Sequence, residues 1–483
     1  MLQRAELETV ITGALSDYPD VAERYRAGDP TVSAMLGAIT NLVMLLSHDT
    51  QANITEPFIK SKDKTIIADA ISKGILPVAT PCQHRLVVEN TGTRTVSLSS
   101  GRTIEDSVGR AWRLMSAVSV PAGQSKTVLC EQSHIMEHRH TCQVSESFYW
   151  LNLPLADDMH LAAINITKPA TKTTYRYTPK FMNAKVGEAA YTLVSEDLSS
   201  ISVIFGDGER CGQTMQAGDE LMIKLTHSYG YIDINSLKQA SLDTINNGDE
   251  RHLLLYFERG GLVRAGADPL SISQMRLLAS FPSTYDQNAV FMGNFDMLIR
   301  QHLMGRIAFM SVWNESVHER YYGASVDNIN HLNLAIVAKT SGDQQALEND
   351  AKQLIARADS LLDGRVRLKS AADKPYAVEI EGQLAGVHDM DGVKTQIKEL
   401  LLAKYGKGTI AASYPNLDGF NRQEIAMLIR ENVPAFQDRI SDFSVKRLQA
   451  EAIRPHEWVY LTESSISVTL TRTAEVSANI WTI

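Results

Sequence analysis

The sequence has few of the features that mark a secreted, membrane-spanning or disulfide-stabilised protein. Only four of its 483 residues are cysteines, too few for a disulfide framework, and we expect a cytosolic compartment to keep them reduced. The longest apolar stretch, residues 34–46, is interrupted by polar residues and is shorter than the roughly 20 residues that a membrane-spanning helix needs. The N-terminus places Arg4, Glu6 and Glu8 where a secretory signal would be apolar. We therefore expect a protein that stays in the cytosol where it is made, with no membrane partner.

The sequence also lacks a strong charge of either sign. It has 47 Lys and Arg residues against 56 Asp and Glu, a formal net charge of −9, without a long run of one sign. A surface that binds nucleic acid would need a basic stripe, so nucleic acid is not expected as a partner. Hydrophobic residues at 44% and charged residues at 21% are typical of globular proteins. The length predicts roughly three to five domains.

Signatures of common enzymes are missing as well. The sequence contains no Gly-x-Ser-x-Gly elbow, no Walker loop and no His-Glu-x-x-His pattern. Residues 388–392 resemble part of a calcium-binding loop, but Val387 and Lys398 stand where two oxygen ligands are needed. Asp391 is better explained as a helix cap. We assign no catalytic, cofactor-binding or metal-binding residue and no cofactor, and we expect the protein not to be an enzyme.

One cluster has the residue types of a metal site: Cys130, His134, His138, His140 and Cys142. A zinc site needs four ligands that converge tetrahedrally. His134 and His138 would share a helical face, whereas His138, His140 and Cys142 would share a strand face, so both arrangements cannot hold throughout. The spacing matches no usual zinc finger. We favour an ordinary strand and loop, and a metal-dependent enzyme that uses this cluster stays open as an alternative function.

Residues 1–78 are predicted to form an N-terminal helical region. Asp29 offers an N-cap, and Pro30 follows in the first turn of the helix. A second helical stretch, residues 63–71, stops at Gly74. The first helix carries apolar residues at spacings of three and four, namely Val32, Met35, Leu36, Ile39, Val43 and Leu46. Such a stripe marks either an internal core or packing against another subunit, and both explanations stay open.

The rest of the chain predicts an α+β multidomain fold. Short apolar runs separated by Asn, Gly and Pro indicate a small β domain over residues 79–150. Residues 151–330 are predicted to form a β-rich central domain with a helix near 294–304, capped by Asn294, and a strand at 307–313. Residues 331–483 predict a C-terminal α/β portion in which small sheets carry helices on one face.

The C-terminal portion gives the most regular pattern. Strands are expected at residues 332–337, 376–380 and 465–471. One helix should be ended by Gly364 and a second should start at Asp391, while Asn421 and Glu424 have the spacing of a capping box for a third. The first of these helices carries Leu347, Ala351, Leu354, Ala358 and Leu361 on one face.

The most informative stretch is a strand-like run from Ile201 that ends in Phe205-Gly206-Asp207-Gly208 and is followed by Gly218 and a second strand from Glu220. Glycine accepts the positive φ that a tight turn requires, so these residues predict a rigid β-hairpin. A phosphate-binding loop would need glycine where the chain has Cys211. We therefore take Phe205, Gly206, Asp207, Gly208 and Gly218 as a structural motif.

This stretch resembles the baseplate-J-like wedge proteins of contractile-tailed bacteriophages and the related tailocins. Three further stretches are similar to the forms of this family from phages of Gram-negative bacteria. They are residues 56–63 with 67–70 and 74–77, residues 101–102 with 106–110, and residues 309–315. Together with the Phe205 motif they are spread over the first two thirds of the chain.

The resemblance implies a structural subunit of the virion. In that family, two copies of the wedge protein associate with a smaller partner, and six wedges close a ring around the tail hub. It also implies an intersubunit helical bundle, contacts between neighbouring wedges through the C-terminal portion, and a rearrangement that triggers contraction of the sheath. The expected partners are other wedge proteins, a second copy of the chain and neighbouring wedges, with the hub and sheath as further candidates. The expected location is the tail baseplate, assembled in the cytoplasm of the host bacterium.

A third class of function also stays open. Exposed aromatic residues such as Trp150 would suit a carbohydrate-binding tail module. The chain lacks the repetitive β-rich composition of an adhesin, which favours the wedge subunit.

Overall fold

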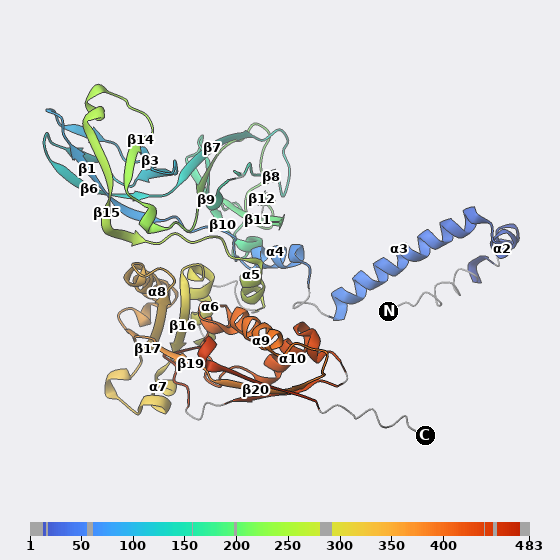
Figure 1. Cartoon of the computed structure of the whole chain (residues 1–483). Helices are drawn as coiled ribbons and strands as arrows, with labels where there is room; N and C mark the ends of the chain where they lie inside the picture. Colours follow the sequence, from blue (N-terminus) through green and yellow to red (C-terminus); the bar gives the residue numbers. More distant parts are fainter. Residues whose placement is uncertain are drawn as a thin grey trace, which may run out of the picture.

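The protein is an α+β multidomain chain, as its sequence predicts. The computed structural model describes residues 13–15, 18–55, 61–156, 158–197, 200–280, 292–438, 440–447 and 452–473. Arg4, Glu6 and Glu8 and the segment 56–60 lie outside these residues. Figure 1 shows the β-rich half above an α/β half, with an N-terminal pair of helices extended to one side.

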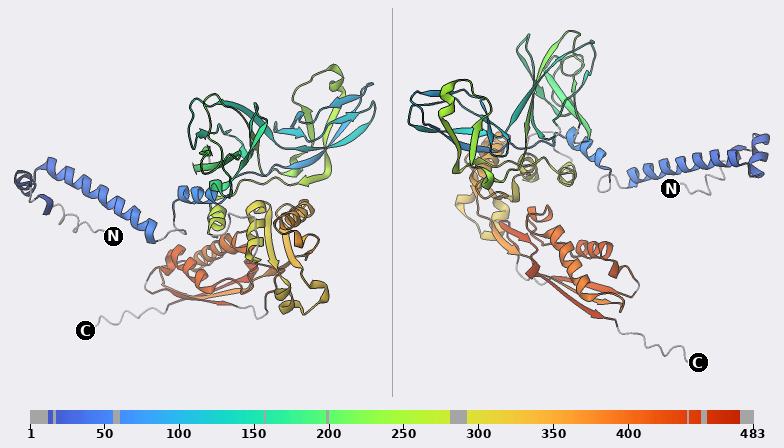
Figure 2. Two further views of the ribbon diagram at one scale, coloured as in Figure 1. Left: turned by 180° about the vertical axis from the view of Figure 1, so that it is seen from behind. Right: turned by 45° about the horizontal axis from the view of Figure 1, so that its top comes forward.

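The N-terminal helices start and stop where the sequence places their signals. The Asp29 carboxylate accepts the backbone N–H of Thr31 at 2.8 Å, which confirms the N-cap, and this hydrogen bond is the largest cause of the lowered pKa of Asp29. Gly74 has φ +79° just after the last turn of the third helix, which confirms that stop. In all the views, α2 and α3 extend away from the rest of the molecule (Figures 1 and 2). The helices are α2 (Pro19–Arg26), α3 (Pro30–Thr55) and α4 (Asp63–Ser72).

A closed six-stranded barrel forms part of the β-rich half. Its strand order is β1, β15, β14, β3, β4, β6. Of these, β14 and β15 come from beyond the boundary predicted at residue 150. Trp112 is fully buried in the barrel and its indole N–H donates to Asp106. Asp106 also accepts from Arg110, so residues 106–110 form a tight turn at the barrel. The strands are β1 (Gln83–Asn90), β3 (Thr103–Asp106), β4 (Ala111–Leu114), β6 (Ser125–Glu131), β14 (Gln239–Leu242) and β15 (Leu253–Arg264), with a separate pair β2 (Val96–Leu98) and β5 (Val118–Val120).

A seven-stranded sheet lies beside the barrel, in the order β7, β13, β9, β10, β11, β12, β8. Helices α4 and α5 pack against one another, and α4 packs against β11, so that one apolar core joins this sheet to both helices. The buried Ile66, Ile67, Ala70 and Ile71 of α4 belong to that core. The elements are β7 (His134–Thr141), β8 (Trp150–Asn152), β9 (His160–Lys168), β10 (Thr173–Tyr177), β11 (Ala190–Asp197), β12 (Ser200–Phe205), β13 (Glu220–Ser228) and α5 (Ile272–Ala279).

The first unit of the α/β half is a three-stranded sheet with helices against it. The strand predicted at residues 307–313 is confirmed, and every residue of it but one is buried. It pairs antiparallel with the next strand, so the boundary predicted near residue 331 falls between two paired strands. Two predicted details are wrong: Asn294 lies inside α6 and is not its cap, and Leu361 lies beyond α8, where it is 74% exposed. The elements are α6 (Met292–Leu303), β16 (Ile307–Trp313), α7 (Glu315–Tyr322), β17 (Leu332–Ala338), α8 (Gln344–Ala358) and β18 (Val366–Leu368).

The second unit is a sheet in the order β21, β20, β23, with two helices on one face (Figure 1). Asp389, not Asp391, is the N-cap of its first helix, since the Asp389 carboxylate accepts from the backbone of Asp391 and Gly392. Asn421 caps the second helix through the N–H of Gln423, which is not the pattern of a capping box. The elements are β20 (Val378–Leu384), α9 (Met390–Tyr405), α10 (Arg422–Asn432), β21 (Asp442–Arg447) and β23 (Ile466–Arg472), with the parallel pair β19 (Ala372–Pro375) and β22 (Glu457–Tyr460) beside them.

In the part of the chain that the structure describes, no helix is both long and apolar enough to cross a membrane.

Candidate functional site

The Phe205 motif is a tight turn held by one carboxylate. Phe205 ends β12 in the core, with its ring centroid 5.3 Å from that of Tyr175 in an edge-on contact. Oδ1 of Asp207 accepts three backbone N–H groups, from Glu209 at 3.2 Å, Arg210 at 2.8 Å and Cys211 at 3.0 Å. These bonds, that from Cys211 first, lower the pKa of Asp207. Oδ1 of Asp207 therefore shapes the turn by accepting backbone N–H groups.

The glycines of this turn are needed for two different reasons. Gly208 and Gly218 have φ of +72° and +88°, which a residue with a β-carbon adopts at a cost. Gly206 does not have positive φ; a β-carbon there would lie 2.2 Å from the carbonyl oxygen of Cys211. The positive φ predicted for the motif as a whole is wrong for Gly206, where the close approach to Cys211 is the constraint.

The turn does not make a β-hairpin. β12 pairs with β11 and β8, whereas β13 pairs with β7 and β9. Three strands therefore separate the two strands that flank the turn, although all belong to the same sheet. The predicted hairpin is a connection across that sheet.

The two cysteines of the possible metal cluster lie in different cores, and His134 and His138 between them are exposed. Cys130 is buried in the barrel, where its thiol donates to the His84 carbonyl, and Cys142 is buried in the core of the seven-stranded sheet. The histidines follow one another along β7, and His140 bonds with the Tyr149 hydroxyl at 2.8 Å. Among the described residues, no group of three or more His, Cys, Asp or Glu is placed to hold a metal ion. The five residues belong to a strand and its flanks.

Trp150, the aromatic residue considered for carbohydrate binding, is 53% exposed on β8. Its indole N–H donates to Asn152 at 2.9 Å on the same strand.

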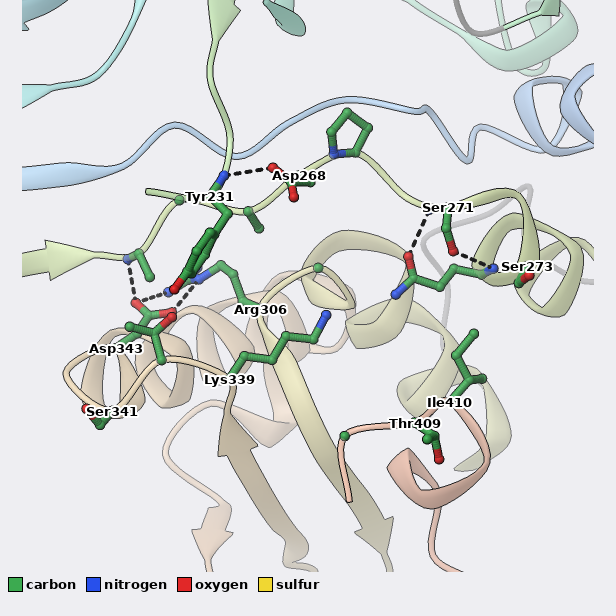
Figure 3. A pocket seen from close by; sticks show the side chains of 18 of the residues that line it. Tyr231, Asp268, Ser271, Ser273, Arg306, Lys339, Ser341, Asp343, Thr409 and Ile410 are labelled. Carbon is green, nitrogen blue, oxygen red and sulfur yellow. Dashed lines mark hydrogen bonds and ion pairs between the residues drawn. The ribbon is translucent and has the colours of Figure 1, made fainter. Parts of the chain in front are cut away.

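A cleft of about 1600 Å³ lies where the β-rich half meets both units of the α/β half (Figure 3). Tyr231 and Asp268 line it from the β-rich half, Lys339 from the end of β17, and Thr409 and Ile410 from the segment after α9. Asp268 accepts the N–H of Tyr231 at 2.9 Å, which holds that wall together. The side chain of Lys339 points into the cleft, where burial lowers its pKa and the charge of Asp268 opposes that effect.

A buried ion pair forms one end of the cleft and joins the two halves. Arg306 precedes β16 and donates from Nε and Nη2 to the two oxygens of Asp343, each at 2.8 Å. The same Asp343 carboxylate accepts the backbone N–H of Ala265, just after β15. Arg306 also bonds to Asp350 on α8. Arg306 and Asp343 are both buried, so the contact between the halves is specific and polar at its centre.

A second buried arginine joins the two α/β units. Arg300 on α6 is fully buried and pairs with Asp296 at 2.8 Å. Its guanidinium donates to the carbonyls of Met310 and Ser413 and lies 3.6 Å from the ring centroid of Tyr414. Met310 belongs to β16 and the other two residues belong to the segment that leads to α10, so Arg300 fixes one unit against the other.

These joints were not found by sequence reasoning. Asp343 stands one residue before α8, where the pattern indicates an N-cap, but its side chain makes no capping bond and takes Arg306 instead. A signal in the sequence is an arginine immediately before a largely apolar strand, because a charge at such a position is costly to bury unless it is paired.

One face of α3 carries exposed apolar side chains. Met35 is 67% exposed, Ile39 53% and Leu42 61%, and spacings of four and three place them on the same side of the helix. Thr40, at another position around the helix, is buried and donates to the carbonyl of Leu36. Of the two explanations for the apolar stripe, an internal core does not account for these three residues.

No protein-family model matches the sequence, and no curated protein matches it either.

Proposed function

We propose that the protein is a structural subunit of the baseplate wedge of a contractile phage tail or tailocin. On this proposal it assembles with other wedge proteins and a second copy of itself into the ring around the tail hub, and has no catalytic activity. The resemblance at the Phe205 motif suggests the family. The turn at Asp207, whose polar groups are directed to shaping the backbone, supports a structural use of that motif.

The observation that carries the proposal is the apolar face of α3. Helix α3 has 26 residues, and Met35, Ile39 and Leu42 line one side of it with more than half of each side chain exposed. A helix of this length extended from the body, with an apolar stripe at spacings of four and three, suits packing against another helix. The proposed occupant is α3 of a second copy, in agreement with the helical bundle that the resemblance implies.

The proposed rearrangement would use the joints between the units. Units joined by a few buried polar contacts have defined orientations, and switching between two such orientations is a common form of large conformational change. Arg306 and Arg300 lie at these contacts, and the cleft beside Arg306 gives the halves room to move. Such a joint can hold one arrangement in the free subunit and another in the assembled ring.

The α3 proposal can be tested with substitutions on one side of the helix. Met35→Glu, Ile39→Glu and Leu42→Glu together put three like charges on the proposed contact. We expect analytical ultracentrifugation to find the unmodified chain as a dimer or larger and the triple variant as a monomer. The melting temperature at low protein concentration should stay the same, since all three side chains are exposed.

Ser33→Glu with Asn41→Glu is the matched control, because both residues are exposed on other sides of α3. The control should associate as the unmodified chain does. A triple variant with unchanged association would rule out this face of α3 as the contact. The family assignment has a separate test: the chain produced together with the genes beside its own should form wedge complexes that electron microscopy can see, and failure of all such complexes would count against it.

A further inference from the structure

A cluster of cationic and aromatic side chains surrounds Tyr322 at the end of α7. Nζ of Lys369 lies 3.2 Å from the centroid of the Tyr322 ring, and the guanidinium carbon of Arg454 lies 5.9 Å from it. The Tyr322 hydroxyl bonds with Nδ1 of His456, and the His318 ring centroid is 4.6 Å from that of Tyr322. These residues come from α7, from the segment between β18 and β19, and from the segment before β22.

The Tyr322 side chain packs on a group of buried aromatic residues. Tyr322 packs against a buried group in which Phe309 of β16 stacks on Trp458 of β22, with ring centroids 5.8 Å apart. The indole N–H of Trp313 donates to Nδ1 of His318 at 3.3 Å, which orients that ring. The cationic side chains therefore lie over Tyr322, which packs against the buried Phe309 and Trp458 of the two α/β units.

The cluster has an excess of positive charge. Within the described ranges, no carboxylate lies within ion-pair distance of the side chain of Lys369 or Arg454. The nearest acid in the sequence, Glu457, is taken by the Lys374 ammonium at 2.8 Å and the Arg454 backbone N–H at 2.7 Å. Burial first and then Arg454 lower the pKa of Lys369, and burial followed by Lys369 and Arg367 lowers that of His318.

Like charges gathered on a half-buried surface lower the stability of the fold unless an anion offsets them. A cation over an aromatic ring is favourable, but the ring does not neutralise it. Lysine and arginine side by side are the residues that bind phosphate and carboxylate oxygens. When Nδ1 of His456 accepts from the Tyr322 hydroxyl, Nε2 of the same ring carries the proton and is a further donor.

We propose that Lys369, Arg454 and His456 form a binding site for an oxyanion, a phosphate or carboxylate group held above the Tyr322 ring. The site goes beyond the wedge function and does not depend on it. The anion could be free phosphate or an acidic side chain of a protein partner. These two sources share the chemistry of charged oxygens, and the experiment below separates them.

Isothermal titration at constant ionic strength, maintained with chloride, tests the site with inorganic phosphate and with hexaglutamate. We expect saturable binding to the unmodified protein. Lys369→Ala and Arg454→Ala should each weaken it by about tenfold, the effect of losing one charge-assisted hydrogen bond. Lys126→Ala, which removes an exposed lysine from β6 of the barrel, should have no effect.

The two probes identify the source of the anion. If both bind and compete, the site takes charged oxygens in general; if only hexaglutamate binds, the natural ligand is a protein carboxylate; if only phosphate binds, it is a small anion. Any of these three results supports the site. Absence of binding by both probes, or affinities that neither Lys369→Ala nor Arg454→Ala changes, would overturn it.

Thermal unfolding separates anion binding from a structural role of Lys369. Phosphate should raise the melting temperature of the unmodified protein and not that of Lys369→Ala, since a ligand stabilises the state that binds it. Without phosphate, Lys369→Ala should melt at the same or a higher temperature because it relieves repulsion from Arg454. If Lys369→Ala melted below the unmodified protein by the same amount with and without phosphate, Lys369 would serve packing alone. That result would refute the proposal.

Discussion

Asp343 binds the Arg306 guanidinium through both of its oxygens and, with one of them, also accepts the backbone N–H of Ala265, 78 residues earlier in the chain. One buried carboxylate thus fixes the start of β16, the start of α8 and the end of β15 relative to one another. A polar joint of this kind defines an orientation more sharply than an apolar contact does, because hydrogen bonds are directional. It also makes the joint sensitive to the loss of either partner.

We predict that Arg306→Ala lowers the free energy of unfolding by about 3 kcal/mol, since it leaves the buried Asp343 charge without its partner. Urea denaturation measures the loss. Arg176→Ala is the matched control: Arg176 forms an ion pair of 2.7 Å with Glu188, but its side chain is 57% exposed. The control should cost less than about 1 kcal/mol. Equal losses for the two variants would mean that burial does not determine the strength of the Arg306 pair.

The turn after β12 gives a graded prediction for three glycines. Gly206→Ala should destabilise by about 3 kcal/mol, since the new β-carbon would press on the carbonyl of Cys211. Gly208→Val should also destabilise, because Gly208 has positive φ and a β-carbon there would lie 2.5 Å from the Thr214 hydroxyl oxygen. Gly218→Ala should lose only about 1 kcal/mol, as positive φ is its one constraint.

Denaturant unfolding ranks these variants against Gly248→Ala as the control. Gly248 lacks positive φ and has no neighbour within 4 Å of a β-carbon. If Gly206→Ala were as mild as the control, the close approach to Cys211 would not constrain this turn.

Local features of the fold could be predicted from the sequence where one segment contains the whole cause. The strand at 307–313 is an apolar run buried on both faces, and the cap at Asp29 needs only the two residues that follow it. Pairing between distant segments could not be predicted in this way. Nothing in residues 239–264 indicates that β14 and β15 return to the barrel, because strand patterns give the burial of each face and not the partner.

The candidate sites could likewise be predicted where one short segment holds all of their residues, and not where distant segments contribute. Phe205, Gly206, Asp207, Gly208 and Gly218 were found because glycine and aspartate have distinct roles in turns that are visible over a few residues. The Arg306 joint and the cluster at Tyr322 combine residues from segments up to about 130 positions apart, as for Tyr322 and His456. The Cys130 to Cys142 cluster shows the converse error, since neighbours in sequence are placed in two different cores.

The division of that cluster predicts that the purified protein holds no stoichiometric zinc. Burial raises the pKa of the Cys130 thiol, and a zinc ligand would have to be the thiolate. Elemental analysis of protein prepared without chelators should find far less than one equivalent of zinc. Cys130→Ser should leave the metal content unchanged while it lowers stability, because a hydroxyl replaces a sulfur in an apolar barrel core. One equivalent of zinc that Cys130→Ser removes would restore the metal-dependent alternative.

Buried histidines make the stability depend on pH on the acid side. His84 in the barrel and His227 on β13 are 2% and 0% exposed, and burial, the first cause in both cases, lowers their pKa values below the ordinary 6.5. The unfolded chain therefore binds protons at these sites before the folded chain does. Their neutral forms support the fold fully above about pH 6.5, and stability is lost as the pH falls below that value, by at most about 1.4 kcal/mol per pH unit for each histidine.

His227→Gln should reduce this acid sensitivity, because glutamine does not take up a proton as the chain unfolds. Denaturant unfolding at several pH values between 5 and 8 measures the slope. The variant is expected to be less stable than the unmodified protein at pH 8, since His227 fills a fully buried position and its Nε2 accepts from the N–H of Ala156 at 3.4 Å. His252→Gln, at an exposed position, is the control for loss of an imidazole. If His227→Gln leaves the slope of the unfolding free energy against pH unchanged, acid sensitivity arises elsewhere in the chain. A flatter slope together with lower stability at pH 8 is the result expected for a neutral buried imidazole.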